Sequence, residues 1–229
     1  MAGTYSLLYL AVIAIAVNNV IAVDYCNLDA CIKKRSIHTM CRYPSSRPAG
    51  ACGQVSSVGF SDAERKAIVN KHNELRRKVA SGQEKRGNPG PQPPAVRMPD
   101  LTWDNELEEI AQRWVIQCNF GHDQCRDVGR FAVGQNAAIG YSSGENRFTV
   151  ESFVQSWYDE VALFDRNQVS RYQFDPNTGH YTQVVWANTT TIGCGLINYN
   201  SYGWNTKYLV CNYGPSGNWI GQKIYEIKY

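Results

Sequence analysis

The feature that most constrains this chain is its content of eight cysteines in 229 residues. All eight follow an apolar N-terminal leader, and an even number behind a secretory leader predicts four disulfides. The competing interpretation, a zinc–thiolate cluster, is disfavoured because the spacing is irregular and no C-x-x-C occurs. Counting alone leaves the connectivity open. The cysteines are Cys26, Cys31, Cys41, Cys52, Cys118, Cys125, Cys194 and Cys211.

Residues 1–22 have the features of a secretory signal peptide. An apolar stretch of eleven residues runs from Leu7 to Val17, about half of what a bilayer-spanning helix needs. The segment before it has no Lys or Arg, but Val20 and Ala22 place small residues before a cleavage site after Ala22. No later stretch is long and apolar enough to span a membrane, so we expect a secreted, extracellular protein without a membrane anchor.

Composition and charge describe an ordinary folded domain. The chain is 43% hydrophobic and 12% aromatic with no low-complexity tract, which argues against disorder, collagen and coiled coil. The formal net charge of +3 is spread along the chain. Two short basic runs, at 33–35 and 76–78, lack interleaved aromatics, so we interpret both as solvated faces and expect no nucleic-acid partner.

The pattern divides the mature chain at about residue 60. Residues 23–60 are rich in Cys, Pro, Gly and Ser without periodicity, which predicts an N-terminal extension held by disulfides on a main domain, 61–229. The main domain opens with a capping box, Ser61 and Glu64, and a helical stripe that stops at Gly82. The stripe comprises Ile68, His72, Leu75 and Val79.

Two further helices are predicted within residues 101–118 and 148–164 from their apolar spacing. The segment 86–100 holds five of the nine prolines and must be a surface loop. The predicted buried faces comprise Leu107, Ile110, Ala111, Trp114 and Cys118 in the first helix, and Phe153, Trp157, Glu160, Val161 and Phe164 in the second.

Alternation with period two near the C-terminus predicts three strands, GHYTQVVW at 179–186, TIGCGLINY at 191–199 and KYLVCNY at 207–213. If Cys194 faces Cys211 across a hairpin, the apolar residues of both strands share faces. That agreement favours a Cys194–Cys211 disulfide, because cross-strand neighbours lie within bonding reach. The other opposed pairs in this register are Leu196 with Leu209 and Ile192 with Tyr213.

Each of the four histidines can be weighed singly. His72 falls on the apolar stripe of the first helix, where a hydrogen-bonded core histidine is expected. His38 has no acidic neighbour and is assigned no role. His122 lies in a loop between cysteines, and His180 begins a predicted strand whose alternation places it on one face with Thr182, Val184 and Trp186.

Glu160 is unusual because it lies on the predicted apolar helix face beside Trp157, where a carboxylate needs a cation, a metal or several donors. An ordinary ion pair with Arg or Lys is the alternative. Together with His122 and His180 it offers the ligand types that zinc uses. However, the three form no local motif such as H-E-x-x-H, and sequence separation does not show that they meet.

Other chemical motifs are missing from the sequence. It contains no phosphate-binding glycine loop followed by a helix, and eight paired cysteines leave no free thiol. One N-glycosylation sequon begins at Asn188, directly after the predicted strand that ends at Trp186.

Two long segments resemble the signatures of the CAP superfamily of cysteine-rich secretory, antigen 5 and plant pathogenesis-related proteins: GHYTQVVWANT at 179–189 and YLVCNYGPSGNW at 208–219. The resemblance covers essentially the whole mature chain. Further segments resemble the antigen 5 proteins of stinging-insect venoms, in particular the ant venom allergen 3 group. These are KHNELRRKVASG, GPQPPAVRMPDLTWD, CNFGHDQCRDVGRFAVGQN and IYEIKY.

The resemblance implies an α+β fold, a three-layer α–β–α sandwich whose central cleft gathers two histidines and two acidic residues. The motifs carry these positions to His122, Glu160 and His180, while the fourth falls on Gln135, where many relatives have Glu. A neutral amide is a poorer ligand for a divalent cation and cannot act as a general base. No cofactor is therefore required, and a zinc ion in the cleft is the alternative.

The resemblance also implies a disulfide pairing, in which three bridges staple the extension to itself and to the loop around His122. Each bridge contributes roughly 2–4 kcal/mol, which predicts a durable extracellular protein. The implied pairs are Cys26–Cys41, Cys31–Cys125, Cys52–Cys118 and Cys194–Cys211.

Three functions follow from the resemblance. The first is a secreted venom protein of the major-allergen type, which acts by binding without catalysis and is bound by host immunoglobulin E. The second is a carrier of small hydrophobic ligands such as a fatty acid, sterol or eicosanoid. The third is a hydrolase that uses a metal or a Ser/His/Glu set, against which Gln135 argues.

Overall fold

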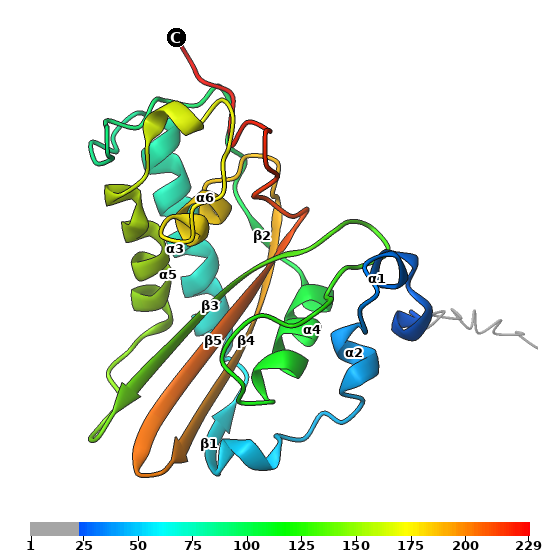
Figure 1. Cartoon of the computed structure of the whole chain (residues 1–229). Coiled ribbons are helices and arrows are strands. Elements are labelled where there is room, and N and C mark those ends of the chain that lie inside the picture. The colour runs from blue at the N-terminus through cyan, green and yellow to red at the C-terminus, as the bar shows by residue number, and fades with distance from the viewer. Residues whose placement is uncertain (1–22) are drawn as a thin grey trace, which may run out of the picture.

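The computed structural model describes residues 23–229, so the predicted signal peptide lies outside the described residues. Figure 1 shows a twisted sheet with helices on both faces. The strand order is β1-β4-β5-β3, all antiparallel, and β2 pairs in parallel with β4. The strands are β1 (Gln54–Val58), β2 (Thr102–Trp103), β3 (Gly134–Ser142), β4 (Thr191–Ser201) and β5 (Trp204–Gly214).

The helices complete the three-layer α–β–α sandwich that the resemblance implies. One face of the sheet packs against α3 (Asp62–Ala80), α5 (Val150–Asp159) and α6 (Gly179–Val184). The other packs against α4 (Asn105–Val115), and beside α4 lie the short helices α1 (Asp29–Lys33) and α2 (Thr39–Arg42) (Figure 1). No helix among residues 23–229 is long and apolar enough to cross a membrane.

The hairpin of β4 and β5 confirms the predicted register. Cys194 is opposite Cys211, and the two predicted apolar pairs oppose each other as well. Because side chains alternate along each strand, Leu209 packs toward α3 and α5 while Val210 packs toward α4. One strand pair therefore supplies the core on both sides of the sheet.

The long helix α3 confirms the predicted N-terminus, since Ser61 and Glu64 form the reciprocal hydrogen bonds of a capping box. Its basic run corrects the sequence interpretation. Arg76 is fully buried, and its guanidinium donates to four main-chain carbonyls. The run 76–78 is therefore not simply a solvated face. The accepting carbonyls belong to Pro99, Val184, Trp186 and Thr189.

Two glycines of β4 allow α4 to lie close to the sheet. A Cβ atom on Gly193 would meet the backbone of Asp104 and Glu108 at 2.2–2.3 Å, and one on Gly195 would meet Ala111 at 2.5 Å. No side chain fits there without moving the helix. This close contact places the loop that follows α4, with His122, over the end of β3.

The predicted strand at 179–186 is wrong, because the segment forms α6 at Gly179–Val184. Its backbone N–H groups at His180 and Tyr181 donate to the carboxylate of Glu160, from a distant part of the chain. The segment from Tyr181 to Trp186 is buried throughout. Its alternation of polar and apolar residues therefore does not separate a buried face from an exposed one. The predicted common face of His180 and Trp186 does not exist.

The sequence interpretation also missed β3. Its residues are mostly small or polar, and it becomes a strand because β5 offers a nine-residue antiparallel partner. Both later helices are shorter than predicted: α4 starts at Asn105 behind the cap Asp104, and α5 ends at Asp159, where a 3₁₀ turn, Glu160–Ala162, begins.

The N-terminal extension is tied to the domain at several points. The structure forms the four disulfides that the resemblance implies. Although β1 lies within residues 23–60, it pairs with β4 at the sheet edge. Cys31–Cys125 and Cys52–Cys118 join the extension to the segment on either side of His122.

Candidate functional site

The four residues implied for the cleft form two hydrogen-bonded pairs. His180 lies at the start of α6 and Glu160 in the 3₁₀ turn after α5, while His122 lies in the loop after α4 and Gln135 on β3. Each histidine bonds through Nδ1, to Glu160 in one pair and to Gln135 in the other. The Nε2 atom of each ring is left without a protein partner among residues 23–229.

Glu160 is fully occupied by local donors. Its Oε1 lies 2.6 Å from Nδ1 of His180, and its Oε2 accepts from the backbone N–H groups of His180 and Tyr181 at 2.9 and 3.1 Å. The predicted position of Glu160 on an apolar helix face is wrong, because α5 ends one residue earlier; the carboxylate is partly buried in the 3₁₀ turn, where several donors satisfy it. Because the carboxylate only accepts, Nδ1 of His180 carries the proton.

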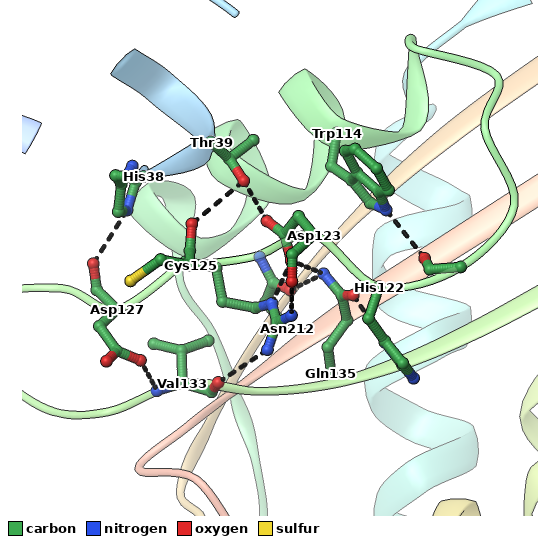
Figure 2. A network of polar contacts seen from close by, with 12 residues as sticks. His38, Thr39, Trp114, His122, Asp123, Cys125, Asp127, Val133, Gln135 and Asn212 are labelled. Atoms are coloured by element: carbon green, nitrogen blue, oxygen red, sulfur yellow. Dashed lines mark hydrogen bonds and ion pairs between the residues drawn. The ribbon is translucent and has the colours of Figure 1, made fainter. Parts of the chain in front are cut away.

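A chain of polar contacts orients the second pair (Figure 2). Oε1 of Gln135 lies 2.8 Å from Nδ1 of His122, while its amide nitrogen donates to Asp123 at 3.1 Å and to Asn212 at 2.9 Å. The Asp123 carboxylate can only accept, so the amide oxygen faces the imidazole. Nδ1–H of His122 therefore donates to Gln135, and Figure 2 shows the other ring nitrogen pointing away from the network.

The surroundings of His122 favour the neutral form of its ring. Loss of water around the ring lowers the pKa of His122 below its ordinary value, and the positive charge of Arg126 acts in the same direction. The hydrogen bond with Gln135 and the charge of Asp123 oppose this shift but do not cancel it. A neutral imidazole with a free Nε2 can accept a hydrogen bond or bind a cation.

Asp123 is the central residue that the sequence interpretation missed. It is buried and accepts hydrogen bonds from Thr39 of the extension and from Arg126, besides Gln135. It is adjacent to His122 in the sequence, but nothing in GHDQC distinguishes a buried acceptor from a solvated one. Asn212 on β5 also accepts a hydrogen bond from the amide of Gln135. The sequence did not indicate this role, because Asn212 fits the alternating pattern of an ordinary strand.

An apolar wall borders the His180 pair. A groove of about 370 Å³ runs between β3, α5 and the loop after α4. His180 and Glu160 line one end, and Phe120 and Phe148, both partly exposed, line the rest. The other lining residues include Ala137, Ala138, Ile139, Phe153 and Trp157.

The donor set does not complete a zinc site. Glu160 and Gln135 use their oxygens on the two imidazoles, which leaves only Nε2 of His122 and of His180. Zinc sites in proteins use three or four protein ligands. Among the described residues no group of three or more His, Cys, Asp or Glu side chains is arranged to hold a metal ion.

No side chain at the groove is set up as a nucleophile. Ser152 and Ser156 line it, but each hydroxyl donates to a main-chain carbonyl of its own helix turn at 2.7 Å. Neither is hydrogen-bonded to His180. All eight cysteines of residues 23–229 are in disulfides.

The remaining histidines have structural roles. His72 is fully buried between a carbonyl of its own helix and the hydroxyl of Tyr213, as predicted, and burial lowers its pKa to about 4. His38, to which the sequence assigned no role, caps α2 through Nδ1 and bonds the carbonyl of Asp127 through Nε2.

Comparison with known proteins agrees with this architecture. Residues 69–213 match the Cysteine-rich secretory protein family, CAP. The chain belongs to the CAP family. It is 56% identical to "Venom allergen 3" of Solenopsis invicta, a match that covers 97% of each chain. It is 46% identical to "Venom allergen 5" of Rhynchium brunneum over 94% of this chain and 95% of that one.

Solved CAP structures show the same fold. The crystal structure of NaASP2 with Zn2+ matches with a TM-score of 0.62 and 34% identity, covering 74% of this chain and 88% of that one. The structure of BmVAL-1 matches with a TM-score of 0.62 and 28% identity, covering 76% and 87%. The zinc ion belongs to the NaASP2 structure.

Proposed function

We propose that this CAP protein is a secreted venom protein that acts by binding rather than by catalysis, and that immunoglobulin E of sting victims recognises it as an allergen. The venom allergens of ants and wasps that it resembles support the venom and allergen parts. Four disulfides within residues 23–229 favour a protein that stays folded outside the cell.

The observation that carries the non-catalytic part is the way both histidine pairs are used. A general base in acyl transfer needs a nucleophile within hydrogen-bond reach. The serine hydroxyls in the groove instead donate to carbonyls of their own helix. Glu160 and Gln135 each hydrogen-bond to an imidazole and orient it. The cleft thus offers acceptor nitrogens and an apolar wall, which are features of a binding site.

The test of catalysis compares the wild type with the double variant Glu160→Gln/His180→Ala. We expect no peptide or ester cleavage above background by either protein, with unchanged thermal unfolding. A reproducible hydrolytic activity that the wild type has and the folded variant lacks would contradict the proposal.

The test of recognition uses sera from sting-sensitised people. Immunoglobulin E should bind the disulfide-intact protein, and reduction followed by alkylation should weaken that binding, because folded surfaces are then lost. Absence of binding in all sensitised sera would contradict the proposal that the protein is an allergen. It would not affect the proposal that the protein acts by binding without catalysis.

A second candidate function is transport of a small hydrophobic ligand, favoured by the aromatic residues Phe120, Phe148 and Trp157 along the groove. Native mass spectrometry of the protein from its secreted source distinguishes it. Extractable lipid whose retention falls in Phe148→Ala supports transport. An additional mass of one zinc, lost in His122→Ala and in His180→Ala, indicates a metal completed by water or by an outside ligand.

A further inference from the structure

A second hollow lies away from the histidine cleft, at the end of the molecule where the C-terminus emerges at the top of Figure 1. Its volume is about 630 Å³, within the roughly 300–1,000 Å³ of small-molecule sites. Three distant segments form it: the proline-rich loop after α3, the 3₁₀ turn Arg166–Gln168 and the final residues. Backbone hydrogen bonds from Arg166 to Pro89 and from Lys228 to Pro94 join them.

Three exposed cations line this hollow, one from each segment: Lys85, Arg166 and Lys228. Within residues 23–229, no carboxylate lies at ion-pair distance from any of the three. Lys85 donates instead to the carbonyl of Gly82 at the end of α3. Like charges held near one another and unpaired attract an anion with several charged groups.

The acidic residues near the hollow have other ion-pair or hydrogen-bond partners. Glu84 is buried and paired with Lys78 and Arg86, and Arg86 also pairs with Asp159. Glu226 pairs with Lys223, and Asp165 caps the 3₁₀ turn through the N–H of Asn167. None of these carboxylates lies at ion-pair distance from Lys85, Arg166 or Lys228.

The remaining lining suits a sugar. Hydroxyls of Ser81 and Ser170 and the amide of Asn167 provide polar partners, and the exposed ring of Tyr229 provides an apolar face. Gln92 also lines the hollow, and its buried Oε1 accepts no hydrogen bond from the described residues. Sulfate groups match the cations, while sugar hydroxyls can both donate and accept.

We propose that this hollow binds a sulfated oligosaccharide of the extracellular glycan class. The hollow is concave and bounded by a proline-stiffened loop, so separate sulfates on one short chain can each reach a cation. A flat anionic bilayer cannot reach into it in this way. The proposal uses no residue of the histidine cleft and stands independently of the proposed function.

The experiment titrates the full disulfide-intact protein with a heparin-derived tetrasaccharide by calorimetry at two salt concentrations. We expect Lys85→Ala/Arg166→Ala/Lys228→Ala to weaken binding by about tenfold or more and to reduce its salt dependence. The matched control, Lys33→Ala/Arg47→Ala/Lys66→Ala, removes three exposed cations that form no ion pair with any residue of 23–229, and should change affinity by less than about twofold.

Two further measurements test whether binding depends on the positive charges of the hollow and on the sulfate groups of the ligand. The charge-retaining variant Lys85→Arg/Lys228→Arg should bind like the wild type, and a fully desulfated tetrasaccharide should not bind. Equal losses in both triple variants would overturn the proposal, because general charge would then explain the affinity. Binding to phosphatidylserine vesicles without binding to the tetrasaccharide would overturn it as well.

Discussion

Nδ1 of His122 lies 2.8 Å from Oε1 of Gln135, and the amide nitrogen of the same glutamine faces the buried carboxylate of Asp123. A neutral amide therefore orients the histidine much as the carboxylate of Glu160 orients His180. The position interpreted from sequence as a poor ligand is a positioning residue, and its own orientation depends on Asp123.

This relationship predicts the tautomer of His122. In the wild type at neutral pH its ring should carry the proton on Nδ1, which two-bond ¹⁵N–¹H spectra of the imidazole report directly. In Asp123→Asn, the new amide can donate, so Gln135 can reverse and the Nε2–H tautomer should gain population. The His180 signals serve as the control and should not change. A wild-type His122 protonated on Nε2 would contradict the assignment.

His72 predicts a loss of stability in acid. Its pKa is about 4 in the folded protein against an ordinary value of about 6.5. Above about pH 6.5 the ring is neutral in both states. Between about 6.5 and 4 only the unfolded state binds the proton, so the free energy of unfolding falls by about 3 kcal/mol in total.

Urea unfolding at several pH values measures this effect. His72→Gln removes the titrating group, so its stability should change less between neutral pH and pH 4 than that of the wild type. The difference between the two slopes isolates His72 from other acid-sensitive groups. Parallel slopes would show that His72 does not titrate as its burial requires.

Arg76 should tolerate no replacement without loss of stability. Its guanidinium donates to four buried or partly buried main-chain carbonyls, and no carboxylate within residues 23–229 lies at hydrogen-bond distance from it. Arg76→Met leaves these acceptors unpaired, at a cost of about 1–3 kcal/mol for each that water cannot reach. The melting temperature of Arg76→Met should fall clearly below that of Lys66→Met, a control at an exposed position of the same helix. Equal melting temperatures would mean that the carbonyls find other donors.

The Cys31–Cys125 disulfide should support the loop that carries His122. It closes a separation of 94 residues, compared with 15 for Cys26–Cys41. Replacing both cysteines by serine should cost roughly 2–5 kcal/mol and speed amide hydrogen exchange around Asp123. Removing Cys26–Cys41 in the same way is the control, and it should leave exchange in that loop unchanged.

The sequon at Asn188 is predicted to carry a glycan in the secreted protein. Its side chain is exposed in the turn after α6, which removes the steric obstacle of a strand. Enzymatic release of N-glycans should lower the mass of the wild type and leave Asn188→Gln unchanged. Identical masses before and after treatment would show that the sequon is not used.

The sequence by itself determined the features whose causes are local or strictly periodic. The capping box at Ser61 uses atoms three residues apart. The register of the terminal hairpin follows because side chains alternate, and a one-residue slip would separate Cys194 from Cys211 and set each strand's core residues against the other face of its partner. The sequence motifs around His122, Glu160 and His180 resemble those of the CAP family, and this resemblance predicted the cleft positions.

Only the tertiary structure decided the features whose partners lie far away in the chain. Glu160 turned a predicted strand into α6 by accepting from its first N–H groups. The small residues of β3 form a strand because their backbone pairs with the edge of β5. Asp123 and Arg76 are buried because acceptors or donors from distant segments surround them. Sequence periodicity records which side chains avoid water, but not which distant group satisfies a buried polar atom.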